Sequence, residues 1–148
     1  MTPDLHAADF AGLDPRTAYL LWQLRSDVFV VEQDCPYPDL DGRDLEPGTV
    51  HLWAEEDGVP IGCLRILEDG EAARIGRVAV RPEHRGAGVA GALMEAAIER
   101  IGPRPSVLDA QAHLAHWYAR FGYRRTGEDF FEDGIPHTPM RRELAVRR

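Results

Sequence analysis

A glycine-rich loop is the part of the sequence whose residue types and spacing most directly suggest chemistry. It reads "RGAGVAG" over residues 85–91. Glycines reach positive φ without steric cost, so several backbone N–H groups of such a loop can converge on one anion. A helical pattern follows at once, and a helix N-terminus adds positive potential. With Arg85 at its start, the loop is predicted to bind a phosphate or pyrophosphate without a metal.

The same letters match the G-x-G-x-x-G fingerprint of dinucleotide-binding proteins, with Asp109 about 20 residues further on. The context argues against that interpretation. In a dinucleotide fold the first glycine stands almost at the end of its strand, inside a βαβαβ unit. Here residues 81–85 separate Val80 from Gly86, and too few residues follow Asp109 to complete the unit. The loop is not a P-loop either, since no Gly-Lys-Ser/Thr follows it.

Turn signals and periodicity indicate the elements that must position this loop. Asp-Gly pairs at residues 57–58, 69–70 and 133–134 are strong hairpin signals, and Asp14-Pro15 is typical of a helix start. The strand–helix–strand step from residue 74 to 110 should be parallel. The sequence predicts an α+β fold in a single domain over residues 1–148, with its core at about 7–145. We expect strands at residues 4–10, 49–56, 59–68, 71–80 and 106–110, two more around residues 133–134, and helices at 16–33, 89–101 and 112–122.

Composition narrows the setting and the partners. The net charge is −8, and 44% of the residues are hydrophobic, as in soluble globular proteins. No apolar run reaches the roughly 18 residues of a membrane span, and the first residues lack a signal-peptide pattern. We therefore expect a cytoplasmic protein with no membrane partner. We also expect no nucleic-acid partner, because nucleic-acid phosphates would repel so acidic a surface.

The acidic charge is concentrated between residues 27 and 46, where only Arg43 is basic. Such a segment could form an acidic rim that attracts a cationic amine, or it could be a solvated loop; composition alone favours the loop. Within it, residues 39–44 lack the ligand spacing of an EF-hand. The two cysteines also lack metal-site spacing, so no metal is expected. The acidic residues are Asp27, Glu32, Asp34, Asp39, Asp41, Asp44 and Glu46.

At this point the sequence resembles a family, the GNAT superfamily of acyl-CoA-dependent N-acetyltransferases. Residues 85–90, "RGAGVA", are similar to its R/Q-x-x-G-x-G/A signature. Residues 75–86, "IGRVAVRPEHRG", resemble the strand that approaches this loop, and residues 111–128 resemble the family's last helix and the strand after it. More narrowly, residues 28–44 and 132–144 resemble the ElaA-like bacterial subgroup. The resemblance implies a twisted, mostly antiparallel sheet flanked by helices, with a splayed parallel strand pair at the acyl-CoA cleft.

The resemblance also implies how acetyl-CoA, as co-substrate, would bind. Its pyrophosphate would take backbone N–H groups of the loop, and its pantetheine arm would lie between the strands that end at Val80 and Ala110. Gln111 could add a side-chain hydrogen bond. The residues implied in cofactor binding are Val78, Ala79, Val80, Arg85, Gly86, Ala87, Gly88, Val89, Ala90, Gln111 and Tyr118.

For catalysis, the resemblance implies direct attack of a neutral amine on the thioester carbonyl. Tyr118 would protonate the leaving thiolate, and a backbone N–H near Val78 would polarise the carbonyl. The base that deprotonates the amine is left open among Glu32, Asp34, His51, His113, His137 and a water chain. His137 stands out because "GIPHTPM" lies where ElaA-like sequences keep a similar run.

We therefore expect an acetyl-CoA-dependent N-acetyltransferase that acts on a small amine or a peptide amine. The alternative is a catalytically inactive coenzyme-A-binding regulatory or sensor domain. Tyr118 favours the enzyme, because a pure binding domain has no need of a thiolate acid there. The identity of the acceptor is not readable from the sequence, and a homodimer is left open.

Overall fold

Two-residue turns set the connectivity of the sheet. The computed structural model describes residues 3–143. Asp57-Gly58 and Asp133-Gly134 both have positive φ at each residue, which is the type I′ geometry that suits twisted hairpins. They connect β2 (Val50–Glu56) to β3 (Val59–Asp69), and β7 (Phe130–Glu132) to β8 (Ile135–Arg142). Gly70, also at positive φ, turns β3 into β4 (Ala72–Val80). The predicted meander and hairpins are thus present.

The strands form one mixed sheet in the order β1-β2-β3-β4-β5-β8-β6, and β7 pairs with β8 beside this path. β1 (Asp4–Ala8) lies at one edge, and β6 (Arg124–Arg125) at the other. All neighbouring strands pair antiparallel except β4 and β5 (Ser106–Gln111), which are parallel. This is the predicted α+β arrangement with one parallel pair.

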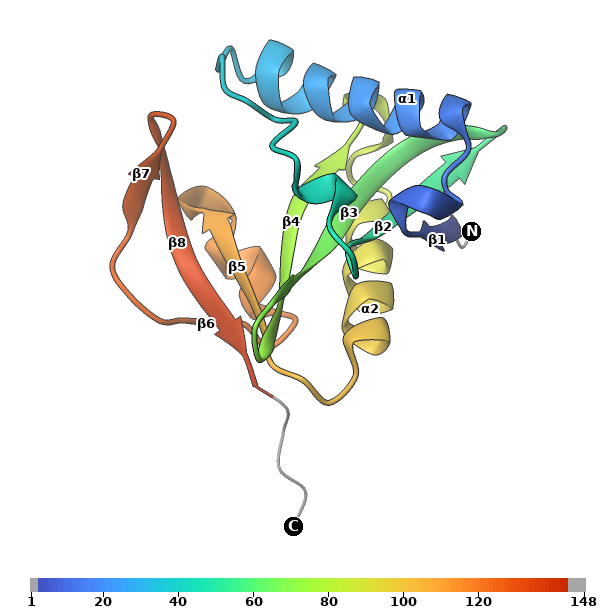
Figure 1. The fold of residues 1–148 in the computed structure, drawn as a ribbon. Helices are drawn as coiled ribbons and strands as arrows, with labels where there is room; N and C mark the ends of the chain where they lie inside the picture. The colour runs from blue at the N-terminus through green and yellow to red at the C-terminus, as the bar shows by residue number, and fades with distance from the viewer. Residues whose placement is uncertain (1–2, 144–148) are drawn as a thin grey trace.

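The parallel pair is short. Ladder pairing between β4 and β5 is limited to Ala73 with Ser106 and Arg74 with Val107. Beyond these residues the two strands diverge, so that the sheet opens like a V (Figure 1). A bulge in β4 accompanies the opening: Gly76 pairs with Arg65 and Ala79 with Cys63, so two residues of β4 face the single residue between them on β3. Among residues 3–143, the C-terminal half of β4 therefore has no strand beside it on the β5 side.

Helices cover the two faces of the sheet (Figure 1). α1 (Pro15–Arg25) begins where Asp14 accepts a hydrogen bond from the Thr17 N–H at 2.8 Å, as predicted for an N-cap followed by proline. It packs Leu21 and Leu24 against Trp53 on one face. α2 (Val89–Ile101) packs on the opposite face over the larger core, which includes Leu93, Met94, Leu108 and Tyr123.

Two helices differ from their predicted lengths. The helix predicted at 16–33 is α-helical only to Arg25 and continues to Glu32 as a π-helical turn. Apolar spacing did not reveal the change to a π-helical turn. Val31 fits the spacing of a regular helix, yet it is exposed in the structure. The helix predicted at 112–122 is a 3₁₀ turn (Ala112–Leu114) followed by the short α3 (Ala115–Ala119).

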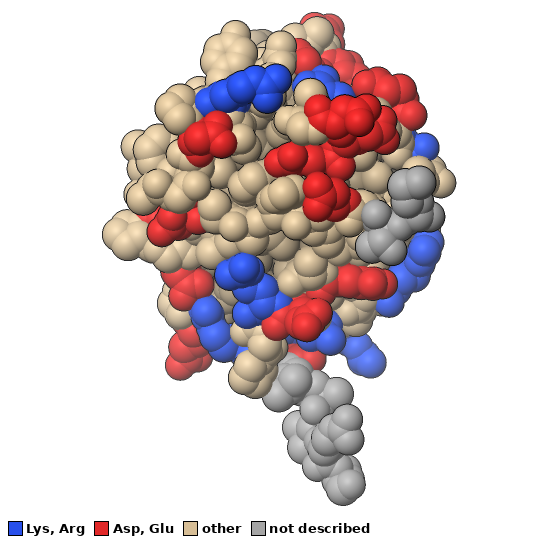
Figure 2. Space-filling view, turned by 90° about the vertical axis from the view of Figure 1, so that its right-hand side faces the viewer, with Lys and Arg blue, Asp and Glu red and all other residues tan. Residues whose placement is uncertain are grey.

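The surface carries mixed charge. Figure 2, which shows the right-hand side of the molecule as drawn in Figure 1, has acidic side chains gathered at the top and both signs interspersed below. Within residues 3–143, no helix is long and apolar enough to cross a membrane.

Candidate active site

An open groove runs through the gap between β4 and β5, with a volume of about 1920 Å³. The glycine loop forms one end of it. The diverging strands form the middle, and the end of the π-helical turn, the loop after it and the β7–β8 hairpin form the other walls. Every residue predicted to bind the cofactor lines this groove, as do Glu32 and His137. The sequence-predicted residues are therefore brought together, although they come from segments up to about a hundred residues apart.

The glycine loop has the geometry of an anion nest. Gly86 and Gly88 have φ of 81° and 83°, a conformation that residues with a Cβ rarely adopt. A Cβ added at either position would meet nothing within 4 Å, so open space lies over both. α2 begins at Val89, and no side chain caps it. Its first N–H groups thus lack an intrahelical partner and are available to a phosphate.

Arg85 is already engaged at the mouth of this nest. Its Nε donates to the Val80 carbonyl at 3.0 Å, and its two Nη atoms donate to the two Glu32 oxygens at 2.6 and 2.7 Å. The hydrogen bonds from Arg85 lower the pKa of Glu32. Glu32 therefore lies at the phosphate end of the groove as an ionised partner of Arg85, which makes it a weak proton acceptor in this arrangement.

Tyr118 lies on α3 with its ring buried in the main core. The neighbouring Tyr123 makes a hydrogen bond with the Ser106 hydroxyl at 2.6 Å, whereas no partner for the Tyr118 hydroxyl is found among residues 3–143. Burial, with a smaller effect of Tyr123, raises the pKa of Tyr118 well above its usual value, so the phenol keeps its proton. A thiol in the same desolvated place would also have a raised pKa, just as burial raises the pKa of the Cys63 thiol.

His137 is the base candidate with the most suitable geometry. It lies on β8 opposite Gln111 of β5. Its Nδ1 is 2.8 Å from the Ile135 carbonyl, and because a carbonyl only accepts, Nδ1 must carry the proton. The neutral ring then has its lone pair on Nε2, free to take a proton. Phe130 stacks on the ring at 5.9 Å between centroids and holds its plane.

The other base candidates separate into two groups. His113 lines the groove and is exposed. Asp34 does not line it. His51 of β2 is buried, with its Nε2 3.3 Å from the Asp44 carbonyl, and burial lowers its pKa. Neither His51 nor Asp34 is placed to deprotonate an amine bound in the groove.

The structure divides the acidic segment in two. Asp39 and Asp44 are buried and, with the more exposed Asp41, pair with arginines from three separate elements. The other acidic residues of the segment are exposed, as the solvated-loop interpretation predicts; they are Asp27, Glu32, Asp34 and Glu46. The ion pairs are Arg25 with Asp39 (3.0 Å) and Asp44 (2.8 Å), Arg65 with Asp41 (2.7 Å) and Asp44 (3.1 Å), and Arg77 with Asp39 (2.8 Å) and Asp41 (3.3 Å). We call these six residues the arginine–aspartate network.

The network favours the ionised forms of Asp41 and Asp44. Burial opposes the charge of Asp41 and Asp44, but the arginine hydrogen bonds outweigh it and lower the pKa of both carboxyl groups. The sequence did contain a signal for this network. Arg25 continues the apolar helix pattern and Arg65 interrupts an apolar strand, and a charge in such a place needs a buried partner.

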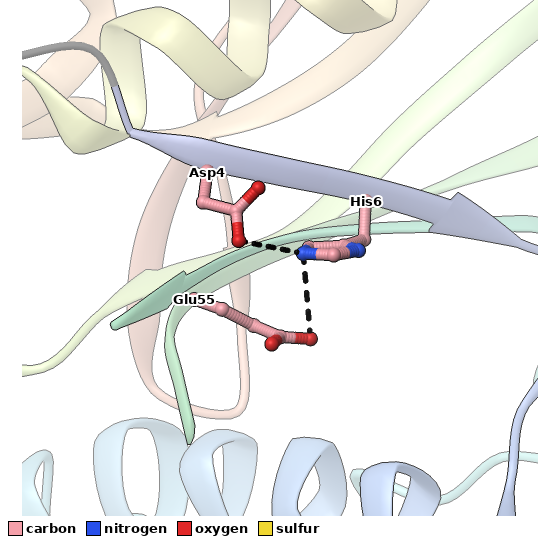
Figure 3. Close-up of side chains that lie close together, drawn as sticks. All are labelled: Asp4, His6 and Glu55. Atoms are coloured by element: carbon pink, nitrogen blue, oxygen red, sulfur yellow. Dashed lines mark hydrogen bonds and ion pairs between the residues drawn. The ribbon is translucent and has the colours of Figure 1, made fainter. Parts of the chain in front are cut away.

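A separate cluster lies on β1 and β2, outside the groove. The Nε2 atom of His6 is 3.1 Å from an Asp4 oxygen and 3.6 Å from a Glu55 oxygen (Figure 3). Trp53 stacks on the His6 ring and donates from Nε1 to the same Glu55 oxygen at 2.7 Å. Ion pairing and stacking account for this arrangement, which joins the edge strand β1 to β2.

Comparison with known proteins places this groove in context. The family model described as "Acetyltransferase (GNAT) domain" matches residues 29–144. A UPF0039 protein of Mycobacterium tuberculosis is 46% identical, over 96% of this chain and 94% of its own length. The crystal structure of Escherichia coli ElaA is 38% identical with a TM-score of 0.90, over 96% of this chain and all of its own. A crystal structure described as an acyl-CoA N-acyltransferase from Pseudomonas aeruginosa is 42% identical with a TM-score of 0.90, over 95% and 99% of the two chains.

Proposed function

Because the chain belongs to the family of GNAT acetyltransferases and shares its fold, we propose that this protein moves the acetyl group of acetyl-CoA to an amine. The observation that carries the proposal is the groove itself. A glycine nest, an unpaired strand edge and the phenol of Tyr118 follow one another along it. These match, in order, a pyrophosphate, an amide-containing arm and a thioester sulfur.

The cofactor would be held mainly by backbone groups. The N–H groups of residues 85–90 and the N-terminus of α2 would bind the pyrophosphate. The free edge of β4 at Val78, Ala79 and Val80 would pair with the amides of the pantetheine arm, much as an added strand does. Gln111 lies across the groove on β5, within the same lining.

Three groups would then share the chemistry. His137 would take the proton of the bound ammonium through Nε2, directly or through water, so that the neutral amine attacks the thioester carbonyl. The Val78 N–H would stabilise the negative charge on that oxygen. As the new C–N bond replaces the C–S bond, Tyr118 would give its proton to the leaving thiolate. The nitrogen of the addition intermediate loses a second proton as the amide forms; that proton restores the phenol of Tyr118, and the proton on His137 passes to solvent.

The alternative of an inactive coenzyme-A sensor predicts the same binding without transfer. Tyr118 favours the enzyme, because its hydroxyl oxygen is not fully buried, lies on a residue that lines the groove, and has no hydrogen-bond partner among residues 3–143, so it can reach a bound sulfur. The acceptor would be a small amine or a peptide amine that reaches the His137 end of the groove.

The test combines binding and turnover. Acetyl-CoA should raise the melting temperature and NAD should not, and a panel of amines should include at least one that releases free thiol from acetyl-CoA. Tyr118→Phe should then lower turnover per folded molecule by about 10²–10⁴-fold while acetyl-CoA affinity changes only a few fold. Stabilisation by NAD alone would overturn the assignment, and near-parent turnover in the phenylalanine variant would remove Tyr118 from the mechanism.

A further inference from the structure

One residue of β4 has a backbone conformation that its side chain does not favour. Arg77 lies in the β4 bulge with φ of 55°, in the left-handed region where a Cβ is crowded by its own backbone. Such conformations persist when the surroundings hold them, and they concentrate at functional sites. The next residue is Val78, whose N–H is the proposed donor to the thioester carbonyl.

The side chain of Arg77 is held from several directions. Its Nη2 donates to the Asp39 carbonyl at 3.0 Å and to an Asp41 oxygen at 3.3 Å, and its Nε lies 2.8 Å from an Asp39 carboxylate oxygen. The guanidinium also lies over the ring of Tyr37, 5.4 Å from its centroid. The backbone of Arg77 is also contacted: the Cys63 thiol donates a hydrogen bond to the Arg77 carbonyl at 3.7 Å.

The groups that hold Arg77 are themselves fixed. Arg25 of α1 binds Asp39 and Asp44, and Arg65 of β3 binds Asp41 and Asp44. Asp39 and both of these arginines are buried. The loop that follows the π-helical turn is thus bound to α1 and to β3. Arg77 is the member of the network that lies on β4, next to Val78.

We propose that Arg77 is a positioning residue: the arginine–aspartate network holds its side chain so that the bulge of β4 keeps its shape and presents the Val78 N–H to the thioester carbonyl. This rests on the proposed function. The same three aspartates, on the loop after the π-helical turn, would then fix both the position of that loop and the position of the amide that polarises the carbonyl. A change in that loop is therefore transmitted to the chemistry through Arg77.

The experiment compares Arg77→Ala, Arg77→Gly and Arg77→Lys with the parent protein. Arg104→Ala, which breaks a surface ion pair with Glu68, is the matched control. Two quantities are measured: amide hydrogen exchange over residues 75–80, and kcat and KM for acetyl transfer per folded molecule. We expect Arg77→Ala to speed exchange in the bulge and to lower kcat by about 10²-fold, the usual effect of misplacing a catalytic group, with KM for acetyl-CoA within a few fold.

The other variants separate positioning from general damage. Glycine accepts the left-handed conformation without a tether, so Arg77→Gly should retain more of kcat than Arg77→Ala. Arg77→Lys keeps the charge but loses the fork, and should fall between the parent and alanine. Parent-like exchange and kcat in Arg77→Ala would overturn the proposal. Acetyl-CoA binding without transfer by the parent would instead overturn the proposed function, and exchange would still decide whether Arg77 holds the bulge.

Discussion

Two arginine clusters at the groove are built in opposite ways. At the glycine-loop end, Arg85 and Glu32 form a bidentate pair in which both side chains are about 40% exposed. In the arginine–aspartate network, which reaches the groove through Asp41, Arg65 and Arg77, Arg25 and Asp44 pair behind the lining at 2% and 6% exposure. Exposed pairs contribute little to stability and exchange readily for another anion, whereas a buried charge left without its partner is costly. The first cluster suits a site that a ligand must enter, and the second suits a fixed scaffold.

The largest expected effect comes from breaking the scaffold. Arg25→Met should lower the free energy of unfolding by about 3–5 kcal/mol, because it leaves Asp39 and Asp44 buried with fewer partners. Urea unfolding measures this change. Arg104→Met, at a surface ion pair, should change stability by less than about 0.5 kcal/mol. Equal effects of the two substitutions would contradict the high cost assigned to breaking the buried network.

The reverse pattern is expected at the nest. Gly88→Glu should weaken coenzyme A binding by at least about 100-fold, because the carboxylate would occupy and repel the pyrophosphate site. Stability should fall only modestly, through the positive φ at this position, since open space surrounds it. Calorimetric titration with coenzyme A, together with urea unfolding, checks both halves. Unchanged affinity would mean that the pyrophosphate binds elsewhere.

Low pH should weaken the arginine–aspartate network without any mutation. The pKa values of Asp41 and Asp44 lie below those of an unfolded chain, so their ionised forms stabilise the folded state at neutral pH. That contribution should be lost progressively as the pH falls below about 4, where the unfolded carboxyl groups begin to bind protons. Unfolding measured between pH 7 and 2.5 tests this, and Asp41→Asn should make the acid loss shallower. A parent and variant with parallel pH profiles would exclude Asp41 as a source.

The smallest expected effect concerns the exposed pair of Arg85 and Glu32. Glu32→Gln removes the carboxylate that competes with the pyrophosphate for Arg85, so coenzyme A should bind up to about fivefold more tightly, the range of an exposed ion pair. Glu83→Gln, which removes a nearby exposed charge without freeing Arg85, is the control. Weaker binding in the glutamine variant of Glu32 would show that this carboxylate supports the cofactor site instead of competing for it.

What the sequence predicts well is local. The Asp-Gly turns, the Asp14-Pro15 helix start and the glycine nest each depend on residues within a few positions of one another, and all are present as expected. The arginine–aspartate network joins residues 14 to 38 positions apart, so no short pattern contains it. The π-helical turn at Ser26–Glu32 was also hidden, because apolar periodicity gives a direction for burial and not the number of residues in a turn.

The candidate site shows the same division. The glycine pattern of residues 85–91 was enough to predict the nest. The family resemblance led us to expect Tyr118 and His137 at the groove. The engagement of Arg85 by Glu32 was not, because it requires the end of a helix and a distant loop to meet in space. The tether on Arg77 was missed for the same reason: its partners lie on a loop that the sequence describes only as acidic.

The two-residue contact between β4 and β5 has a mechanical consequence. It divides the sheet into two lobes, one built on β1–β4 and the other on β5–β8, which meet in that ladder only at the closed end of the V. A ligand with peptide-like amides would act there as a splint across the gap, restoring the missing ladder. The core that α2 covers already joins the two lobes through Leu108 and Tyr123, so the splint would close the open edge without having to set where β8 lies.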